Sequence, residues 1–233
     1  RRGMKPLVLL PGMMCDARLF GPQIGALSGA HTVHCAPIGG HDTMAALASE
    51  ILAHAPPHFA LAGLSMGGIV AMEVLRQAPD RVDRIALLDT NPLAETEGVR
   101  ARRGPQMQAV AAGGLARVMR EEMKPNYVFA EEGRAAILDL CMEMALALGP
   151  DVFRRQSLAL RDRPDQTETL RAFDGPALVL CGAHDIPCPV SRHELMHELM
   201  PQSRLAILPE AGHLTTLEAP HAVTDALKEW LAV

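Results

Sequence analysis

The sequence is poor in aromatic residues, which make up only 3% of its 233 residues, and it has no dense cluster of lysine and arginine. Its formal net charge of −5 is mild. Proteins that bind nucleic acid usually combine a basic surface with aromatic side chains on which bases stack. The composition therefore argues against nucleic acid and against an anionic membrane surface as partners.

Long apolar runs are also missing, since none approaches the roughly 20 residues that a membrane-spanning helix needs. The opening segment, RRGMKPLVLL, leads into a candidate strand and shows no cleavage site, so we do not expect a secretory signal peptide. An odd number of cysteines without a CxxC pair favours free thiols and a reducing cytoplasm. These cysteines are Cys15, Cys35, Cys141, Cys181 and Cys188.

Short apolar runs alternate with helical patterns along most of the chain. The candidate strands are residues 6–10, 31–38, 59–64, 84–89, 177–182 and 204–209, and the candidate helices are residues 43–54, 66–77, 190–200 and 219–231. Most of the strands are apolar on both faces, as in a parallel sheet covered by helices. The pattern predicts an α/β protein with a doubly wound, mostly parallel six-stranded sheet.

The alternation stops after the fourth strand, and residues from about 99 to 160 are helical in pattern. We predict a core of residues 1–92 and 173–233 with an all-helical lid of residues 93–172 inserted between its two parts. Such a lid would cover the carboxyl ends of the strands, where open α/β sheets bind ligands. Its methionines predict a largely apolar pocket. They are Met107, Met119, Met123, Met142 and Met144.

A lone polar side chain, Ser65, stands between a buried strand and a helix in the stretch GLSMGG. Gly63 and Gly67 complete the pattern G-x-S-x-G, which presents a nucleophilic serine on a sharp strand-to-helix turn. Side chains two residues before and two after the serine would collide across that turn, which is why both positions are glycine.

A nucleophilic serine needs a base and an acid that orients the base, and in this architecture they follow in the order Ser, Asp or Glu, His. Asp185 comes directly after the fifth strand, and His213 comes after the sixth. We predict that His213 takes the proton of Ser65 and that Asp185 fixes the tautomer of His213. Asp89, at the end of the fourth strand, is the alternative acid.

An oxyanion formed at Ser65 needs backbone N–H donors. The N–H of Met66 lies at the start of the helix that follows the serine. The loop after the first strand, LLPGMMCDARLF, offers the N–H of Met13 as the second donor, because Gly12 lets the backbone turn back.

These motifs, together with GAHDIPCP and EAGHLTTLEAP, make the chain similar along essentially its whole length to the α/β-hydrolase-fold serine hydrolases, in particular the compact lidded esterases and lactonases. The resemblance implies hydrolysis of a carboxylic ester, thioester or lactone without a cofactor, with Ser65, Asp185 and His213 as triad and Met13 and Met66 as oxyanion hole. Carbon–carbon bond hydrolysis and cofactor-free perhydrolysis would use the same triad, and some proteins of this fold only bind ligands.

The sequence departs from that family in having Pro11-Gly12 where a His-Gly pair is frequent, and in lacking two N-terminal strands of the larger members.

The sequence also contains HELMH at residues 193–197, a match to the zinc-peptidase motif H-E-x-x-H. No third ligand is apparent, so we expect a solvated helix and no metal. The lid arginines could receive a substrate carboxylate, but a solvent-facing position is the simpler expectation for each of them. They are Arg100, Arg102, Arg103, Arg117, Arg120, Arg154 and Arg155.

Overall fold

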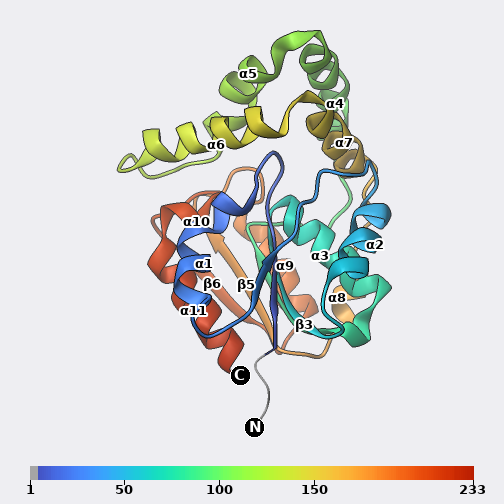
Figure 1. Cartoon of the computed structure of the whole chain (residues 1–233), viewed down its shortest axis with the longest axis vertical. Helices are drawn as coiled ribbons and strands as arrows, with labels where there is room; N and C mark the ends of the chain where they lie inside the picture. The colour runs from blue at the N-terminus through green and yellow to red at the C-terminus, as the bar shows by residue number, and fades with distance from the viewer. Residues whose placement is uncertain (1–4) are drawn as a thin grey trace.

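A six-stranded parallel sheet forms the centre of the protein, whose computed structural model describes residues 5–233 (Figure 1). The strand order is β2-β1-β3-β4-β5-β6, and every neighbouring pair is parallel. The strands are β1 (Leu7–Leu10), β2 (Val33–Cys35), β3 (Phe59–Leu64), β4 (Val82–Leu88), β5 (Ala177–Gly182) and β6 (Arg204–Leu208). The predicted fold class is therefore confirmed. Residues 1–4 lie outside the described residues. They belong to the opening segment in which we expect no signal peptide.

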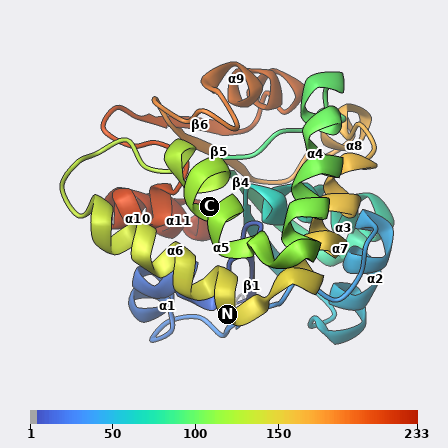
Figure 2. The same cartoon turned by 90° about the horizontal axis from the view of Figure 1, so that it is seen from above.

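Helices cover both faces of the sheet, which explains why β1, β3 and β5 are fully buried (Figures 1 and 2). One face carries α1 (Gly21–Leu27), α10 (Thr215–Glu218) and α11 (Pro220–Ala232), and the other carries α2 (Met44–His54), α3 (Met66–Gln77), α8 (Thr167–Arg171) and α9 (Val190–Leu199). The sequence reading missed α1, because Gly21, Pro22 and Gly25 lie inside it and resemble a loop.

The edge strand β2 is shorter than predicted, three residues instead of eight. Among the described strands it pairs with β1 alone, and Pro37, which has no N–H to donate, follows closely. The central strand β3 and the helix α3 match their predicted bounds, because buried apolar runs and glycines delimit them sharply.

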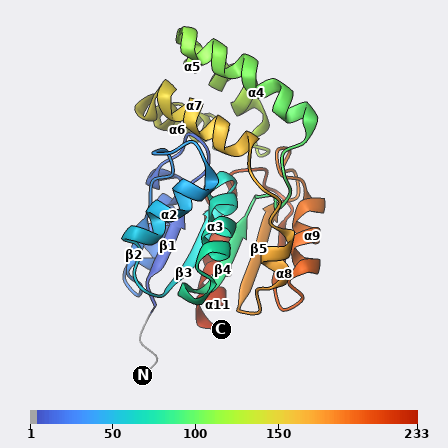
Figure 3. The same cartoon turned by 90° about the vertical axis from the view of Figure 1, so that its right-hand side faces the viewer.

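Between β4 and β5 the chain forms helices and helical turns that lie across the carboxyl ends of the strands (Figure 3). They are α4 (Glu97–Ala109), α5 (Leu115–Val118), α6 (Arg134–Leu148) and α7 (Pro150–Arg161), with π-helical turns at Val110–Gly114 and Met119–Met123. Gly113 has a φ of 92°, a left-handed conformation that kinks the chain between α4 and α5. Within residues 5–233, no helix has both the length and the apolar character needed to cross a bilayer.

Candidate active site

Ser65 occupies the turn between β3 and α3 in a strained conformation, with φ of 54° and ψ of −117°. Its backbone N–H donates to the Leu88 carbonyl oxygen at 2.9 Å, which fixes the turn to β4. A Cβ on Gly63 would lie 2.2 Å from the Gly67 carbonyl oxygen, and one on Gly67 would lie 2.0 Å from the Leu10 carbonyl oxygen. The two glycines are therefore required for the turn to form against β1.

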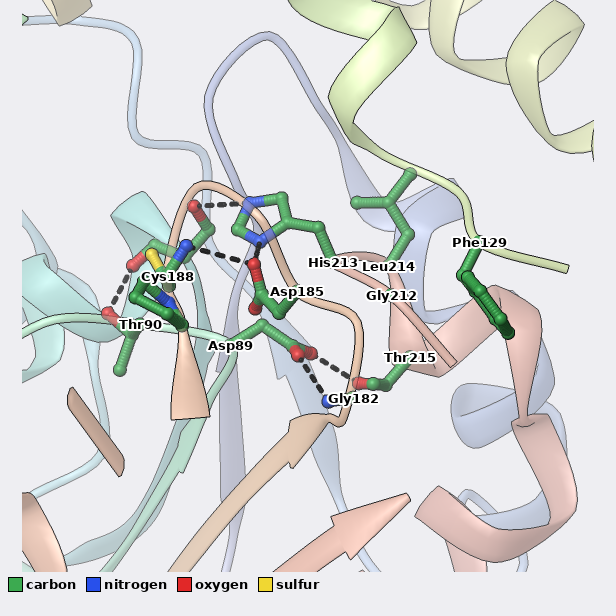
Figure 4. A network of polar contacts seen from close by, with 12 residues as sticks. Asp89, Thr90, Phe129, Gly182, Asp185, Cys188, Gly212, His213, Leu214 and Thr215 are labelled. Atoms are coloured by element: carbon green, nitrogen blue, oxygen red, sulfur yellow. Dashed lines mark hydrogen bonds and ion pairs between the residues drawn. The ribbon is translucent and has the colours of Figure 1, made fainter. Parts of the chain in front are cut away.

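The side chains of Ser65, His213 and Asp185 lie in hydrogen-bond contact (Figure 4). His213 Nε2 is 3.0 Å from Ser65 Oγ, and His213 Nδ1 is 2.8 Å from Asp185 Oδ1. Because a carboxylate oxygen can only accept, Nδ1 carries the ring proton and Nε2 is free to accept one from Ser65. The fold thus brings together the three side chains that the sequence reading grouped.

His213 and Asp185 are almost completely buried, with exposed fractions of 4% and 5%. The backbone N–H of Cys188 donates to Asp185 Oδ1 at 2.9 Å, which holds the carboxylate in place within its own turn. Cys188 and Cys181 are buried thiols, and burial raises the pKa of each. All five cysteines are free, and they act here as small apolar side chains.

The second buried carboxyl group, Asp89, does not touch His213. It accepts hydrogen bonds from the backbone N–H of Gly182 at 3.1 Å and from the hydroxyl of Thr215 (Figure 4). Burial, followed by the charge and contact of Asp185, raises its pKa well above the usual value. The geometry therefore favours Asp185 over Asp89 as partner of the histidine, and it places Asp89 beside that partner, a contact that the sequence reading missed.

The backbone around His213 is held by a residue that the sequence reading did not single out, Glu218. Its carboxylate accepts from the N–H groups of Gly212 at 3.0 Å and Leu214 at 3.0 Å, on either side of His213. It also accepts from the N–H of Phe129, at 2.8 Å, in the loop that enters α6. The N–H of His213 itself donates to the Tyr127 carbonyl oxygen at 3.0 Å. The helical layer is thereby joined to the histidine loop.

The loop after β1 lies against the serine turn, since a Cβ on Gly12 would be 3.7 Å from the Cβ of Ser65. The neighbouring N–H of Met14 donates to Gln156 Oε1 at 2.8 Å, and Met14 has a positive φ of 55°. A side chain from α7 thus fixes the loop that carries Met13. The N–H of Met66 is the first in α3, where helical N–H groups have no intrahelical partner.

A cavity of about 710 Å³ opens next to Ser65 and His213, between the strand ends and the helical layer. That volume suits a small organic molecule. Met13, Met66 and Met123 line it together with Ile69, Val99 and Leu160. The expectation of a lid methionine pocket is largely wrong, because Met107, Met119, Met142 and Met144 do not line the cavity. Met119 and Met144 are instead buried elsewhere, and the Met144 sulfur accepts from the N–H of Asp16, in the loop after β1, at 3.4 Å.

Arginine is the unexpected feature of this cavity. Arg102 and Arg103, from the predicted lid arginines, line it, and so do Arg163 and Arg192, which the sequence reading had not considered. The simpler expectation of a solvent-facing position is therefore wrong for Arg103, which is only 9% exposed. The other five predicted lid arginines lie outside the cavity lining.

The helix that contains HELMH is solvated on one side only: Glu194 and Glu198 are exposed, but His193 faces the core. His193 is completely buried, its Nε2 accepts from the N–H of Thr90 at 3.0 Å, and its Nδ1 lies 3.1 Å from the Pro189 carbonyl oxygen, to which it donates. Both ring nitrogens are thus used by the backbone. His197 Nδ1 lies 2.7 Å from Ser203 Oγ. Across residues 5–233, no three His, Cys, Asp or Glu side chains are grouped to hold a metal ion.

The fold and this constellation define a hydrolase of the α/β class. The chain matches the model of the alpha/beta hydrolase family over residues 7–226 and belongs to that family. It is 29% identical to a thermophilic esterase from Thermogutta terrifontis, solved with malate bound, over 98% of this chain and 89% of that one, with a TM-score of 0.87.

Two curated relatives are informative. The chain is 30% identical, over 98% of its length, to the dihydrolipoyllysine-residue acetyltransferase component of the acetoin cleaving system of Pseudomonas putida, but it spans only 64% of that longer protein. It is 23% identical to the pimeloyl-[acyl-carrier protein] methyl ester esterase of Nitrosomonas europaea, over 92% of this chain and 90% of the relative.

Proposed function

We propose that this protein hydrolyses carboxylic esters, thioesters or lactones through an acyl-enzyme on Ser65. The observation that carries the proposal is the continuous contact from Asp185 through His213 to Ser65 beside the cavity. The similarity to named esterases supports it. A free serine hydroxyl is a weak nucleophile, and a hydrogen-bonded imidazole is the base that activates it.

In this mechanism Ser65 Oγ attacks the carbonyl carbon while His213 Nε2 takes its proton. Asp185 keeps the Nδ1–H tautomer and stabilises the imidazolium that forms. The N–H groups of Met13 and Met66 hold the oxyanion, and His213 then returns the proton to the leaving alcohol. Water activated by the same imidazole releases the acid from Ser65. No step calls for a metal or a cofactor.

Residues 93–172 serve in this proposal as a lid that shapes the cavity and limits the entry of water. The substrate is a small molecule, and no nucleic acid or membrane takes part. We place the reaction in the cytoplasm, because all five cysteines are free thiols.

The test uses p-nitrophenyl esters with acyl chains from two to twelve carbons, for wild type and Ser65→Ala. We expect turnover by the wild type and a loss of several orders of magnitude in the variant, as roughly found when a triad serine is removed. Cys15 is a matched control, because it lies buried in the loop beside the site, and Cys15→Ala should stay active. A folded wild type that cleaves neither these esters nor methyl esters that carry a carboxylate would contradict the esterase proposal and favour a ligand-binding role.

A further inference from the structure

The wall of the cavity carries more positive than negative charge. Its titratable lining consists, besides His213, Cys188 and Tyr127, of four arginines and two glutamates, Glu95 and Glu122. Glu122 also lies within 3.5 Å of Arg117, so part of its charge is balanced from outside the cavity. A pocket for a neutral acyl chain has no need of this excess, because desolvating cations costs free energy without a partner.

The excess of positive charge is concentrated in a buried cluster formed by Glu95, Arg103 and Arg163. Arg103 donates to both Glu95 oxygens, from Nη2 at 2.6 Å and from Nε at 3.1 Å, and Arg163 Nη1 donates to Glu95 Oε1 at 3.2 Å. The exposed fractions of the three side chains are 2% for Glu95, 10% for Arg103 and 8% for Arg163. Two guanidinium groups thus share one carboxylate, and burial lowers the pKa of Arg163.

Some N–H donors of this cluster have no strong acceptor among the described residues. Within residues 5–233, the thioether sulfur of Met13, at 3.7 Å, is the only hydrogen-bond acceptor of Arg103 Nη1, and a thioether is a weak acceptor. This contact places the guanidinium directly behind the side chain of the candidate oxyanion-hole residue. Arg163 donates its Nε–H to the Leu93 carbonyl oxygen at 2.9 Å, and it lines the cavity together with Cys188, in the turn of Asp185. The unused donors therefore lie at the reacting end of the cavity.

We infer that the ester accepted by this site carries a carboxylate, which pairs with Arg103 and Arg163 and brings the buried cluster to two guanidinium groups and two carboxylates. This inference rests on the proposed function and names its substrate class. Planar guanidinium groups recognise carboxylates by paired hydrogen bonds, as Arg103 already does with Glu95. Arg102 and Arg192 add attraction for an anion from the same cavity.

The test compares monomethyl esters of succinate, glutarate and adipate with the methyl esters of the corresponding monoamides. The two members of each pair have nearly the same size and differ in charge. For wild type we expect kcat/KM to be at least about tenfold higher for the acid than for the amide, a difference of about 1.4 kcal/mol. The chain length with the largest ratio measures how far the cluster lies from Ser65.

Arg103→Met should bring the ratio of acid to amide close to one, and Arg103→Lys should restore it only in part. The ratio compares two substrates on the same variant, so a merely structural loss of active protein does not change it. If Arg103→Met fails to fold, the pair Arg102→Gln and Arg192→Gln, which removes the less buried charges, should lower the ratio severalfold. Arg154→Gln is the control, because Arg154 is exposed on α7 outside the cavity lining.

A wild-type ratio of one or less, with hydrolysis still dependent on Ser65, would overturn the carboxylate inference and leave the serine hydrolase intact. A preference for butyryl phosphopantetheine over butyryl N-acetylcysteamine without any preference among the hemiesters would assign the cluster to a phosphate and would equally overturn it. If neither the methyl esters nor the p-nitrophenyl esters are cleaved, the proposed function itself fails.

Discussion

Asp89 and Asp185 are two buried carboxyl groups in contact beneath the histidine, and only Asp185 touches the ring. Asp185 Oδ2 is buried and receives no hydrogen bond from another donor within residues 5–233. Asp89, whose pKa is raised by burial and by the neighbouring Asp185, is suited to carry a proton and donate it to that oxygen. Two ionised carboxylates in contact would otherwise repel each other.

Asp89→Asn should therefore keep most of the activity at neutral pH, within about threefold, because an amide also donates to a carboxylate. Asp89→Ala should lose about tenfold or more, since the Asp185 oxygen, the N–H of Gly182 and the hydroxyl of Thr215 all lose a partner. Steady-state kinetics on a p-nitrophenyl ester separates these outcomes. An Asn variant as impaired as the Ala variant would show that Asp89 acts in its ionised form.

The same proton has a signature in stability. Because the folded state raises the pKa of Asp89, it holds this proton more tightly than the unfolded chain does. This contribution is complete below the unfolded pKa of about 3.9 and is lost as the pH rises through the folded pKa. The amide of Asp89→Asn has no such proton to lose. As the pH rises above 4, the free energy of unfolding of this variant, measured in urea, should therefore decrease less than that of wild type.

His193 has the opposite effect on how stability depends on pH. Burial lowers its pKa to about 4, so the folded state binds fewer protons than the unfolded chain between pH 4 and about 6.5. The stability of wild type is then fully present above pH 6.5 and falls by up to about 3 kcal/mol as the pH drops to 4. His193→Gln keeps an acceptor for the N–H of Thr90 and should flatten this acid limb. The exposed His221→Gln is the control and should follow wild type.

Glu218 offers a test of how the histidine loop is positioned. Glu218→Ala leaves the N–H groups of Gly212, Leu214 and Phe129 without their acceptor. A displaced imidazole can reduce kcat by about 10²-fold, and we expect a loss of 10- to 100-fold with a smaller change in KM. Glu229→Ala, which removes an exposed carboxylate on α11, should leave kcat unchanged. Equal kinetics for both variants would show that the loop keeps its place without Glu218.

Gly67 tests the steric basis of the serine turn. Gly67→Ala would drive a Cβ to 2.0 Å from the Leu10 carbonyl oxygen, backbone that cannot yield cheaply. We expect a loss of about 3 kcal/mol or more in the free energy of unfolding. Gly98→Ala, on α4 with nothing within 4 Å of the new Cβ, should instead be neutral or stabilising by up to about 1 kcal/mol. Thermal unfolding of the pair would contradict the account if both variants melt alike.

The six strands of the parallel sheet and the three side chains at their carboxyl ends were predictable, because buried strands and a glycine-flanked serine leave strong local patterns. The residues that line the cavity could not be predicted in this way. Arg103 is buried and Met107 does not line the cavity because of the way α4 is turned about its axis. Amino-acid composition does not reveal that orientation. Glu218 lies five residues after His213, at the end of α10, yet its role depends on three backbone donors that only the folded chain brings together.

The central claim, an acyl-enzyme on Ser65, is tested most directly by rapid quenching of the reaction with p-nitrophenyl butyrate, followed by intact-protein mass spectrometry and peptide mapping. The account predicts a mass increase of one butyryl group on the peptide that contains Ser65, with a matching burst of p-nitrophenolate. Ser65→Ala should show neither. Turnover by wild type with no acyl group on Ser65, or with the group on another side chain, would contradict the mechanism.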